Sequence, residues 1–240
     1  MRILLVEDEK ELSRALAKML MTEGYDVDTV YDGADGLSFS LSGLYDLIIL
    51  DVIMPKKNGF EVLKRAAVLG LITRNSKGIC FSGTHGKTTT SSMAAHILHN
   101  SSVGCNAFLG GILRNYDSNL LLSETSPYTV IEADEFDRSF HHLTPYVAVV
   151  TSTDPDHLDI YGTEEAYLES FAHFTELINP DGYLLLHEGL KLKPRPSEGV
   201  KVYTYSRDKG DFHATNIRRG NGSITFDLVT PNGVFNDFEL

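Results

Sequence analysis

Short apolar segments alternate with amphipathic segments along most of the chain. Residues 3–6 predict a buried strand. Residues 9–23 predict a helix, because apolar side chains recur there at a spacing of three and four: Leu12, Ala15, Leu16, Met19 and Leu20. Gly24 is suited to end that helix. The same patterns predict strands at 25–30, 46–50, 78–82, 128–132, 146–151 and 183–186, and helices at 32–41, 59–72, about 90–99 and 164–177.

The alternation of strands and helices predicts an α/β fold, with a parallel sheet flanked by helices. A polar break is expected at 73–77, between the helix at 59–72 and the next strand. After about residue 200 the sequence pattern changes to short, turn-rich segments in which apolar and polar residues alternate. Residues 202–205 and 224–228 are therefore predicted to be antiparallel strands near the C-terminus.

A glycine-rich segment connects the strand at 78–82 to the helix that follows: Gly83-Thr84-His85-Gly86-Lys87-Thr88-Thr89. In such a loop the glycines let backbone amides face phosphate oxygens, and the start of the helix adds partial positive charge. Lys87 would supply a full charge, and the Thr88 hydroxyl is suited to Mg²⁺. The strict P-loop motif is not met, because Phe81 stands where its first glycine would be. The alternative is an ordinary turn that happens to carry Lys-Thr.

Two later segments belong to the same pattern: Val130-Ile131-Glu132-Ala133-Asp134-Glu135-Phe136-Asp137-Arg138-Ser139-Phe140 and Asp154-Pro155-Asp156-His157-Leu158-Asp159-Ile160-Tyr161-Gly162. With the glycine-rich loop, they resemble the phosphate-binding motif and the two metal-binding motifs of the Mur ligase family. His85 is typical of its alanine-adding and murein-peptide members, since other members usually have Asn there. The resemblance covers residues 65–240 and implies the central ATP-binding domain of such a ligase.

The resemblance implies roles for individual residues. Thr88 and Glu132 would hold the Mg²⁺ that bridges the phosphates of ATP, and His157 would hold a second Mg²⁺. Lys87, Glu132 and His157 would be the catalytic residues. Read without the resemblance, His157 is more simply a loop histidine, and Asp134, Glu135 and Asp137 could equally form a solvated acidic turn.

The implied reaction is ATP-dependent amide-bond formation. The carboxylate of UDP-N-acetylmuramate would attack the γ-phosphate of ATP, releasing ADP and giving an acyl phosphate, from which the amino group of L-alanine would then displace phosphate. Catalysis of this kind depends on positioning and electrostatics. Because the resemblance covers the central domain alone, we expect weak binding of ATP or ADP and little ligation.

The first 64 residues carry a different set of carboxylates. Glu7 and Asp8 follow the first predicted strand, and Asp51 follows the third. Carboxylates gathered at one edge of a sheet repel each other unless a cation lies between them, which favours an Mg²⁺ site. With the segment 51–59, these residues resemble a response-regulator receiver domain. The resemblance implies that Asp51 accepts phosphate from a histidine kinase, and that Asp8, Asp51 and the carbonyl of Ile53 bind Mg²⁺.

The receiver resemblance covers residues 1–64 only. A receiver has a fourth strand ending in Ser or Thr, which Ser82 could imitate, and a fifth ending in Lys. No lysine lies between Lys87 and Lys191, so signalling is in doubt. The helix at 59–72 joins the two parts without a linker, which suggests a chimera spliced inside a helix. On that hypothesis the strand at 78–82 would extend the receiver's strands into a single sheet.

Composition limits the remaining possibilities. The formal net charge of −12 argues against nucleic-acid and membrane-surface partners, because their phosphates repel an acidic protein. Cys80 and Cys105 have no metal-ligand spacing, and the sequence has no signal-peptide pattern, so cytoplasm is expected. Three functions therefore remain open: an ATP-dependent ligase or its nucleotide-binding core, a phosphoacceptor domain, and a chimeric scaffold without activity.

Overall fold

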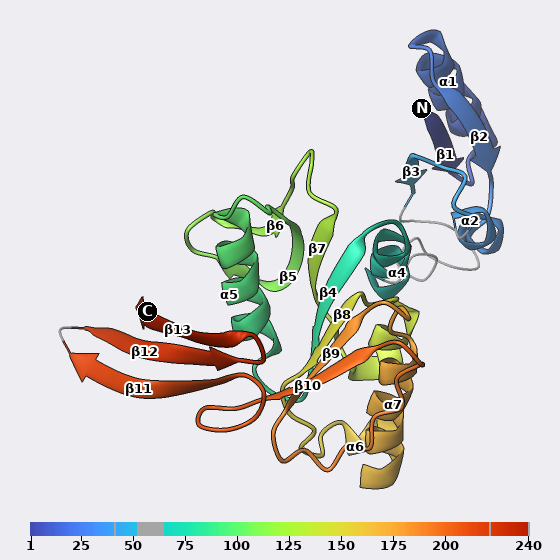
Figure 1. The fold of residues 1–240 in the computed structure, drawn as a ribbon. Helices are drawn as coiled ribbons and strands as arrows, with labels where there is room; N and C mark the ends of the chain where they lie inside the picture. Colours follow the sequence, from blue (N-terminus) through green and yellow to red (C-terminus); the bar gives the residue numbers. More distant parts are fainter. Residues whose placement is uncertain (41, 52–64, 221, 240) are drawn as a thin grey trace. The chain divides into compact units, whose positions relative to one another are not determined.

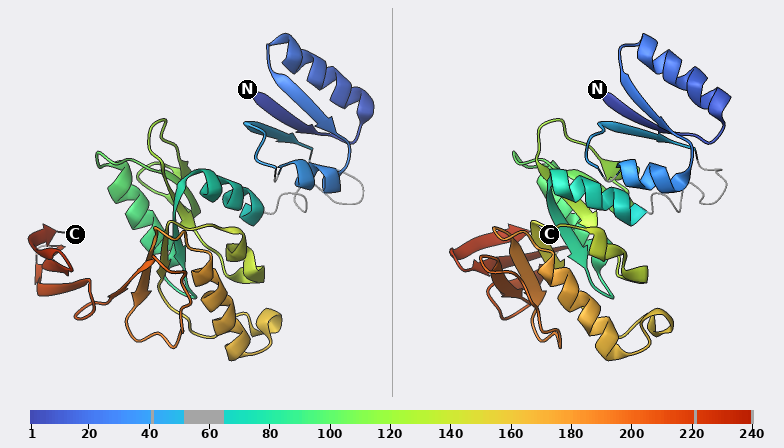
Figure 2. Two further views of the ribbon diagram at one scale, coloured as in Figure 1. Left: turned by 45° about the vertical axis from the view of Figure 1, so that its right-hand side comes forward. Right: turned by 90° about the vertical axis from the view of Figure 1, so that its right-hand side faces the viewer.

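The computed structural model describes residues 1–40, 42–51, 65–220 and 222–239. The chain divides into two compact units, Met1–Leu71 and Ile72–Leu240, whose elements are drawn in Figures 1 and 2. None of the described helices is both long and apolar enough to cross a lipid bilayer. The predicted α/β fold with parallel sheets is confirmed in both units.

The first unit contains a parallel three-stranded sheet in the order β2-β1-β3. Its elements are β1 (Arg2–Val6), α1 (Lys10–Thr22), β2 (Asp26–Val30), α2 (Gly33–Ser40) and β3 (Leu47–Leu50). The two helices lie on opposite faces of the sheet (Figure 2). The central strand β1 is buried from its second residue onward, as its continuous apolar run predicts.

Helix α1 confirms its predicted position but turns a different side toward the sheet. Its buried residues are Ser13 and Ala17, whereas Leu12 and Met19 are exposed. The predicted apolar face was therefore wrong in part. Small side chains four residues apart let a helix lie close to a sheet, and Leu16 and Leu20 on the same side of the helix are half-buried. Gly24 follows the helix at φ +86°, a conformation that favours glycine, as predicted.

The second unit is built on a seven-stranded sheet in the order β10-β9-β8-β4-β7-β5-β6. Its strands are β4 (Lys77–Ser82), β5 (Asn106–Leu113), β6 (Ser118–Leu121), β7 (Tyr128–Glu132), β8 (Val147–Val150), β9 (Tyr183–His187) and β10 (Lys201–Tyr205). Neighbouring strands are parallel except β5 and β6, which are antiparallel. The sequence did not predict β5 or β6, because glycines and polar residues interrupt their apolar pattern.

Helices cover both faces of this sheet. The helical elements from residue 65 onward are α4 (Arg65–Asn75), which crosses the boundary between the two units, α5 (Lys87–His99), the 3₁₀ helix η1 (Phe136–His142), α6 (Leu158–Tyr161) and α7 (Glu164–Glu176). Helices α5 and α7 lie on opposite faces (Figure 1). The expected break at 73–77 was wrong for the residues up to Asn75, which continue α4. Thr73 is buried there and accepts a hydrogen bond from the Thr144 amide (3.1 Å), so tertiary contacts override the polar sequence.

The hypothesis of one continuous sheet was wrong. Strand β4 pairs with β7 on one side and β8 on the other, and β1, β2 and β3 form a separate sheet in the described part of the chain. A buried apolar strand carries no signal of which sheet it joins, and β4 finds partners on both sides within its own unit. Residues 59–64 of the predicted junction helix lie outside the described residues.

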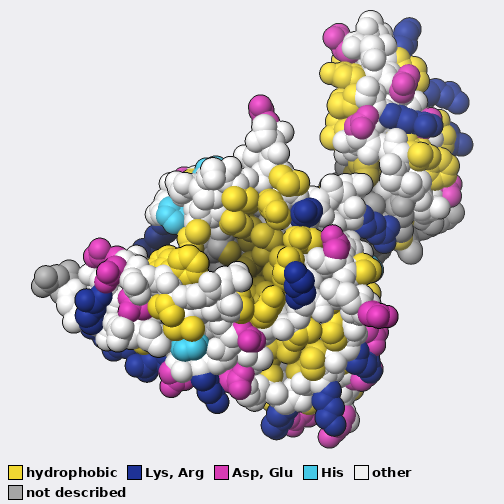
Figure 3. Space-filling view, viewed as in Figure 1, with side chains coloured by type: hydrophobic (Ala, Val, Ile, Leu, Met, Phe, Trp, Pro, Cys, Tyr) yellow, Lys and Arg dark blue, Asp and Glu magenta, His cyan; other side chains and the backbone are white. Residues whose placement is uncertain are grey.

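The C-terminal strands differ from the prediction in one respect. Strand β10 runs parallel to β9, so its antiparallel prediction was wrong, since alternation alone does not set strand direction. Strands β11 (His213–Gly220), β12 (Ser223–Thr230) and β13 (Gly233–Glu239) form the expected antiparallel sheet. Figure 3 shows apolar side chains gathered beside this sheet, whose own Val234, Phe235 and Phe238 are exposed.

Candidate functional site

The glycine-rich loop runs from the end of β4 at Ser82 to the start of α5 at Lys87. Gly83 has a φ of +134°, and a Cβ at this position would collide with the Thr151 hydroxyl. Gly86 has a φ of +85° where the helix begins. Both positions need glycine, because a side chain would be strained at such φ values. The loop therefore packs closely against the segment that follows β8.

Hydrogen bonds fasten the loop to that segment. The Thr84 hydroxyl donates to the Asp154 carbonyl (2.7 Å), and the Thr84 amide donates to the Ser152 carbonyl (3.3 Å). The His85 amide donates to the Ser152 hydroxyl (2.7 Å), and the Thr151 hydroxyl donates to the His85 carbonyl (2.5 Å). These hydrogen bonds fix Thr84 and His85 against the segment after β8. The backbone amides of the first turn of α5 come after these two residues in the chain and take no part in these bonds.

Helix α7 supports the loop from a second direction. Tyr167 is completely buried, and its hydroxyl lies 2.9 Å from the Thr84 hydroxyl. Burial raises the pKa of Tyr167 well above its ordinary value, so its hydroxyl remains protonated. The side chain can therefore act as a permanent hydrogen-bond partner for the loop.

Lys87 makes an ion pair that the sequence did not predict. Its ammonium donates to the Gly83 carbonyl (2.8 Å) and lies 2.9 Å from Oε1 and 2.7 Å from Oε2 of Glu135. Glu135 is only 1% exposed. Burial raises the pKa of the Glu135 carboxyl, while Lys87 acts in the opposite direction. The acidic segment signalled a role for its carboxylates, but nothing in it distinguished Glu135 from its neighbours.

Thr88 and Glu132 lie together at the carboxyl edge of the sheet. The Thr88 hydroxyl donates to Glu132 Oε1 (2.9 Å), and the Gly110 amide donates to Oε2 (2.9 Å). A Cβ at Gly110 would collide with this carboxylate, so the glycine of β5 lets Glu132 lie against the backbone. A hydroxyl and a carboxylate are both oxygen ligands of the kind Mg²⁺ prefers. The pair therefore fits the predicted metal site.

His157 lies in the loop after β8, at φ +52° immediately before α6. Its ring makes an edge contact with Phe136 (5.2 Å between centroids), and Nε2 is 3.9 Å from the Asp156 carboxylate. In the described part of the chain it forms no hydrogen bond or ion pair with Thr88 or Glu132. The structure thus places His157 on the segment after β8, whose Thr151, Ser152 and Asp154 contact the phosphate loop.

A cavity of about 390 Å³ borders the same segment. Its lining residues come from the loop after β8, from the start of α7 and from the turn after β9: Thr151–Pro155, Glu164 and His187–Lys191. Lys191 donates to Glu164 Oε1 across this region (2.8 Å). The cavity shares Thr151 and Ser152 with the phosphate loop's hydrogen-bond partners, so the two features are neighbours.

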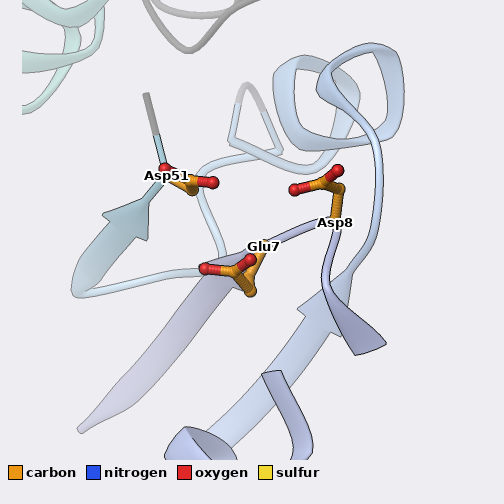
Figure 4. A group of neighbouring side chains, drawn as sticks. All are labelled: Glu7, Asp8 and Asp51. Atoms are coloured by element: carbon orange, nitrogen blue, oxygen red, sulfur yellow. The ribbon is translucent and has the colours of Figure 1, made fainter. Parts of the chain in front are cut away.

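The first unit holds the predicted acidic cluster. Carboxylate oxygens of Glu7, Asp8 and Asp51 lie within 4.8 Å of one another, where β1 and β3 end (Figure 4). Glu7 is buried, and its Oε1 accepts the Glu9 amide (3.1 Å). The geometry of these three side chains is suited to a divalent cation. The remaining predicted ligand, Ile53, lies outside the described residues.

Comparison with known proteins identifies the family. The family model of the Mur ligase middle domain matches residues 81–240, which is most of the chain. The chain belongs to the Mur ligase family. The predicted motifs around Lys87, Glu132 and His157 all fall inside this match. A second family model, the response regulator receiver domain, matches residues 3–96 and overlaps the Mur ligase match.

Curated Mur ligases resemble this chain over much of its length. UDP-N-acetylmuramate–L-alanine ligase of Phocaeicola vulgatus is 63% identical over 185 residues, covering 77% of this chain and 40% of the relative. The enzyme of the same name from Parabacteroides distasonis is 66% identical over 186 residues, again covering 77% and 40%. The chain therefore spans about 40% of the length of these relatives.

Solved structures of Mur ligases share the fold. The murein-peptide ligase of Neisseria meningitides aligns with a TM-score of 0.60 at 20% identity, covering 97% of this chain and 85% of that one. The UDP-N-acetylmuramate–alanine ligase of Thermotoga maritima aligns with a TM-score of 0.60 at 18% identity, covering 100% and 60%. At these identities the alignments establish the Mur ligase fold and nothing finer.

Proposed function

We propose that the part of this chain from about residue 65 binds the phosphates of Mg-ATP and is the nucleotide-binding core of an ATP-dependent carboxylate–amine ligase. The observation that carries the proposal is the grouping of Lys87, Thr88 and Glu132 where β4 and β7 end. Ligands bind at the carboxyl edges of parallel sheets. The high identity to UDP-N-acetylmuramate–L-alanine ligases supports the same function.

Each residue of the loop has a distinct proposed role. Gly83, Thr84 and His85 shape the loop, and the amides of Gly86 to Thr89 meet the phosphates, since first-turn amides have no acceptor within the helix. Lys87 neutralises phosphate charge. Thr88 and Glu132 hold Mg²⁺, and His157 holds a second Mg²⁺. Bound Mg²⁺ would polarise the transferring phosphoryl group, while the residues of this chain orient it.

The acceptor substrates are proposed from the relatives. UDP-N-acetylmuramate and L-alanine are the substrates that their names print. Because the chain matches about 40% of each relative, we expect measurable nucleotide binding, and we expect ligation to require the rest of the relatives' sequence. A radiometric or coupled assay for phosphate release with both substrates checks this expectation.

Substituting Glu132 tests the proposed metal site. Glu132→Gln retains an oxygen that can accept from Thr88 and Gly110, but it removes the charge that attracts Mg²⁺. We expect wild type to bind ATP roughly tenfold or more tightly with Mg²⁺ than with EDTA, and the variant to lose most of this difference. Isothermal titration with ATP, with Mg²⁺ and with EDTA, measures it.

The matched control is Glu165→Gln, which removes one exposed carboxylate from α7. This variant should keep the full Mg²⁺ dependence of wild type. If Glu132→Gln kept it too, Glu132 would have no part in binding the metal.

A second function is supported by a separate observation, the clustered carboxylates of Glu7, Asp8 and Asp51. We propose that this unit can accept a phosphoryl group on Asp51, with a histidine kinase as the natural donor. Incubation with acetyl phosphate and Mg²⁺ should add the mass of one phosphoryl group to wild type and none to Asp51→Asn. Intact-protein mass spectrometry decides this. An unmodified wild type, together with no nucleotide binding, would favour the inactive scaffold.

A further inference from the structure

The contacts of Lys87 leave it little freedom. A lysine ammonium carries three N–H donors. The Gly83 carbonyl and the Glu135 carboxylate, at 2.8 Å and 2.7 to 2.9 Å, take at least two of them. The Lys87 side chain is 15% exposed, so the ammonium is reached from a narrow range of directions. A phosphate oxygen that approaches Lys87 must share it with these acceptors.

The carboxylate of Glu135 is fixed beside Lys87. Its side chain is 1% exposed, and its backbone carbonyl accepts hydrogen bonds from the buried Tyr161 hydroxyl (2.5 Å) and the Arg138 amide (3.0 Å). The segment that carries Glu135 is therefore held on more than one side. Charges that are shielded from water interact strongly, so this negative charge acts on whatever binds Lys87.

The neighbouring carboxylates have other partners. Glu132 accepts from Thr88 and Gly110, while Asp134 is exposed and accepts from the Phe136 amide (3.2 Å). Of the three carboxylates, it is Glu135 that pairs with Lys87. Glu135 is thus distinguished from Glu132 and Asp134 by its position and not by its chemistry.

We propose that Glu135 is a positioning residue that competes with phosphate for Lys87 and so limits the affinity of the site for polyphosphates. This inference rests on the proposed nucleotide-binding function. Two anions cannot share one ammonium without repelling each other, so each phosphate bound at Lys87 is opposed by the Glu135 charge. The consequence for the reaction is that the product nucleotide is released more readily than from an unopposed lysine.

The test compares wild type with Glu135→Gln, which preserves the shape of the side chain and an oxygen acceptor for Lys87 but removes the charge. Isothermal titration with Mg-ATP, Mg-ADP and adenosine separates phosphate contacts from nucleoside contacts. We expect roughly tenfold tighter binding of ATP and ADP by the variant and unchanged binding of adenosine. Asp134→Asn, which removes an exposed charge one residue away, should bind all three ligands like wild type.

Circular dichroism and thermal unfolding establish that each variant is folded. If Glu135→Gln does not fold, Glu135→Asp replaces it in the test, because the shorter side chain keeps the charge but moves it away from Lys87. This variant should bind ATP more tightly than wild type, by a smaller factor than is expected for Glu135→Gln. A folded variant that binds ATP no more tightly than wild type overturns the inference, as does an equal gain in Asp134→Asn. Absence of ATP binding by wild type overturns the proposed function itself, and this inference with it.

Discussion

Lys87→Ala is expected to lower the affinity for Mg-ATP at least about 100-fold, because it removes the only lysine or arginine of the Gly83–Thr89 loop. Hydrogen bonds to charged groups contribute about 1.5–3 kcal/mol each, and an ammonium contacts more than one phosphate oxygen. Adenosine binding should change little, since it has no phosphate. Isothermal titration with both ligands measures the difference.

The same substitution has a cost to stability that must be separated from the loss of binding. Removing Lys87 leaves the buried Glu135 carboxylate without its counter-ion, and breaking a buried ion pair in this way costs about 3–5 kcal/mol. The double variant Lys87→Ala/Glu135→Gln removes both charges and should recover much of this stability. It should bind ATP somewhat more tightly than Lys87→Ala, because the opposing charge of Glu135 is gone, but still far more weakly than wild type. Wild-type affinity in either folded variant would rule out Lys87 as the phosphate ligand.

Phe140→Ala is expected to lower the free energy of unfolding by about 3–5 kcal/mol. Phe140 is completely buried in η1, where it stacks on Phe174 (4.9 Å between centroids) and makes an edge contact with Phe171 (5.2 Å). Truncation would leave a cavity between η1 and α7. Because α7 also carries Tyr167, nucleotide binding should weaken as well.

Urea unfolding followed by circular dichroism measures this effect. Phe136→Ala, in the same 3₁₀ helix, is the matched control, because Phe136 is 48% exposed and should cost less than about 1 kcal/mol. Equal losses in the two variants would mean that η1 does not pack on α7 as the structure describes.

The features that the sequence predicted well are local ones. The phosphate loop was recognisable because its glycines, lysine and threonines lie within seven consecutive residues between a strand and a helix. The strand predicted at 128–132 has the same bounds as β7, Tyr128–Glu132. Such signals need no knowledge of the rest of the chain, since backbone geometry and side-chain periodicity generate them.

The features that the sequence missed depend on residues far apart in the chain. Glu135 lies 48 residues from Lys87, and Tyr167 lies 83 residues from Thr84. Gly110 contributes a backbone amide, which leaves no trace in side-chain chemistry. Packing likewise decides which sheet β4 joins and in which direction β10 runs. The sequence pattern of a strand does not indicate its partner strands or its direction.

The most direct test of the proposed site is a crystal structure of this protein with Mg²⁺ and a non-hydrolysable ATP analogue. The phosphates should lie on the first turn of α5 and contact Lys87, with Mg²⁺ bound by the Thr88 hydroxyl and the Glu132 carboxylate. An analogue bound elsewhere, with Lys87 contacting only Gly83 and Glu135, would contradict the assignment of this loop as the phosphate site.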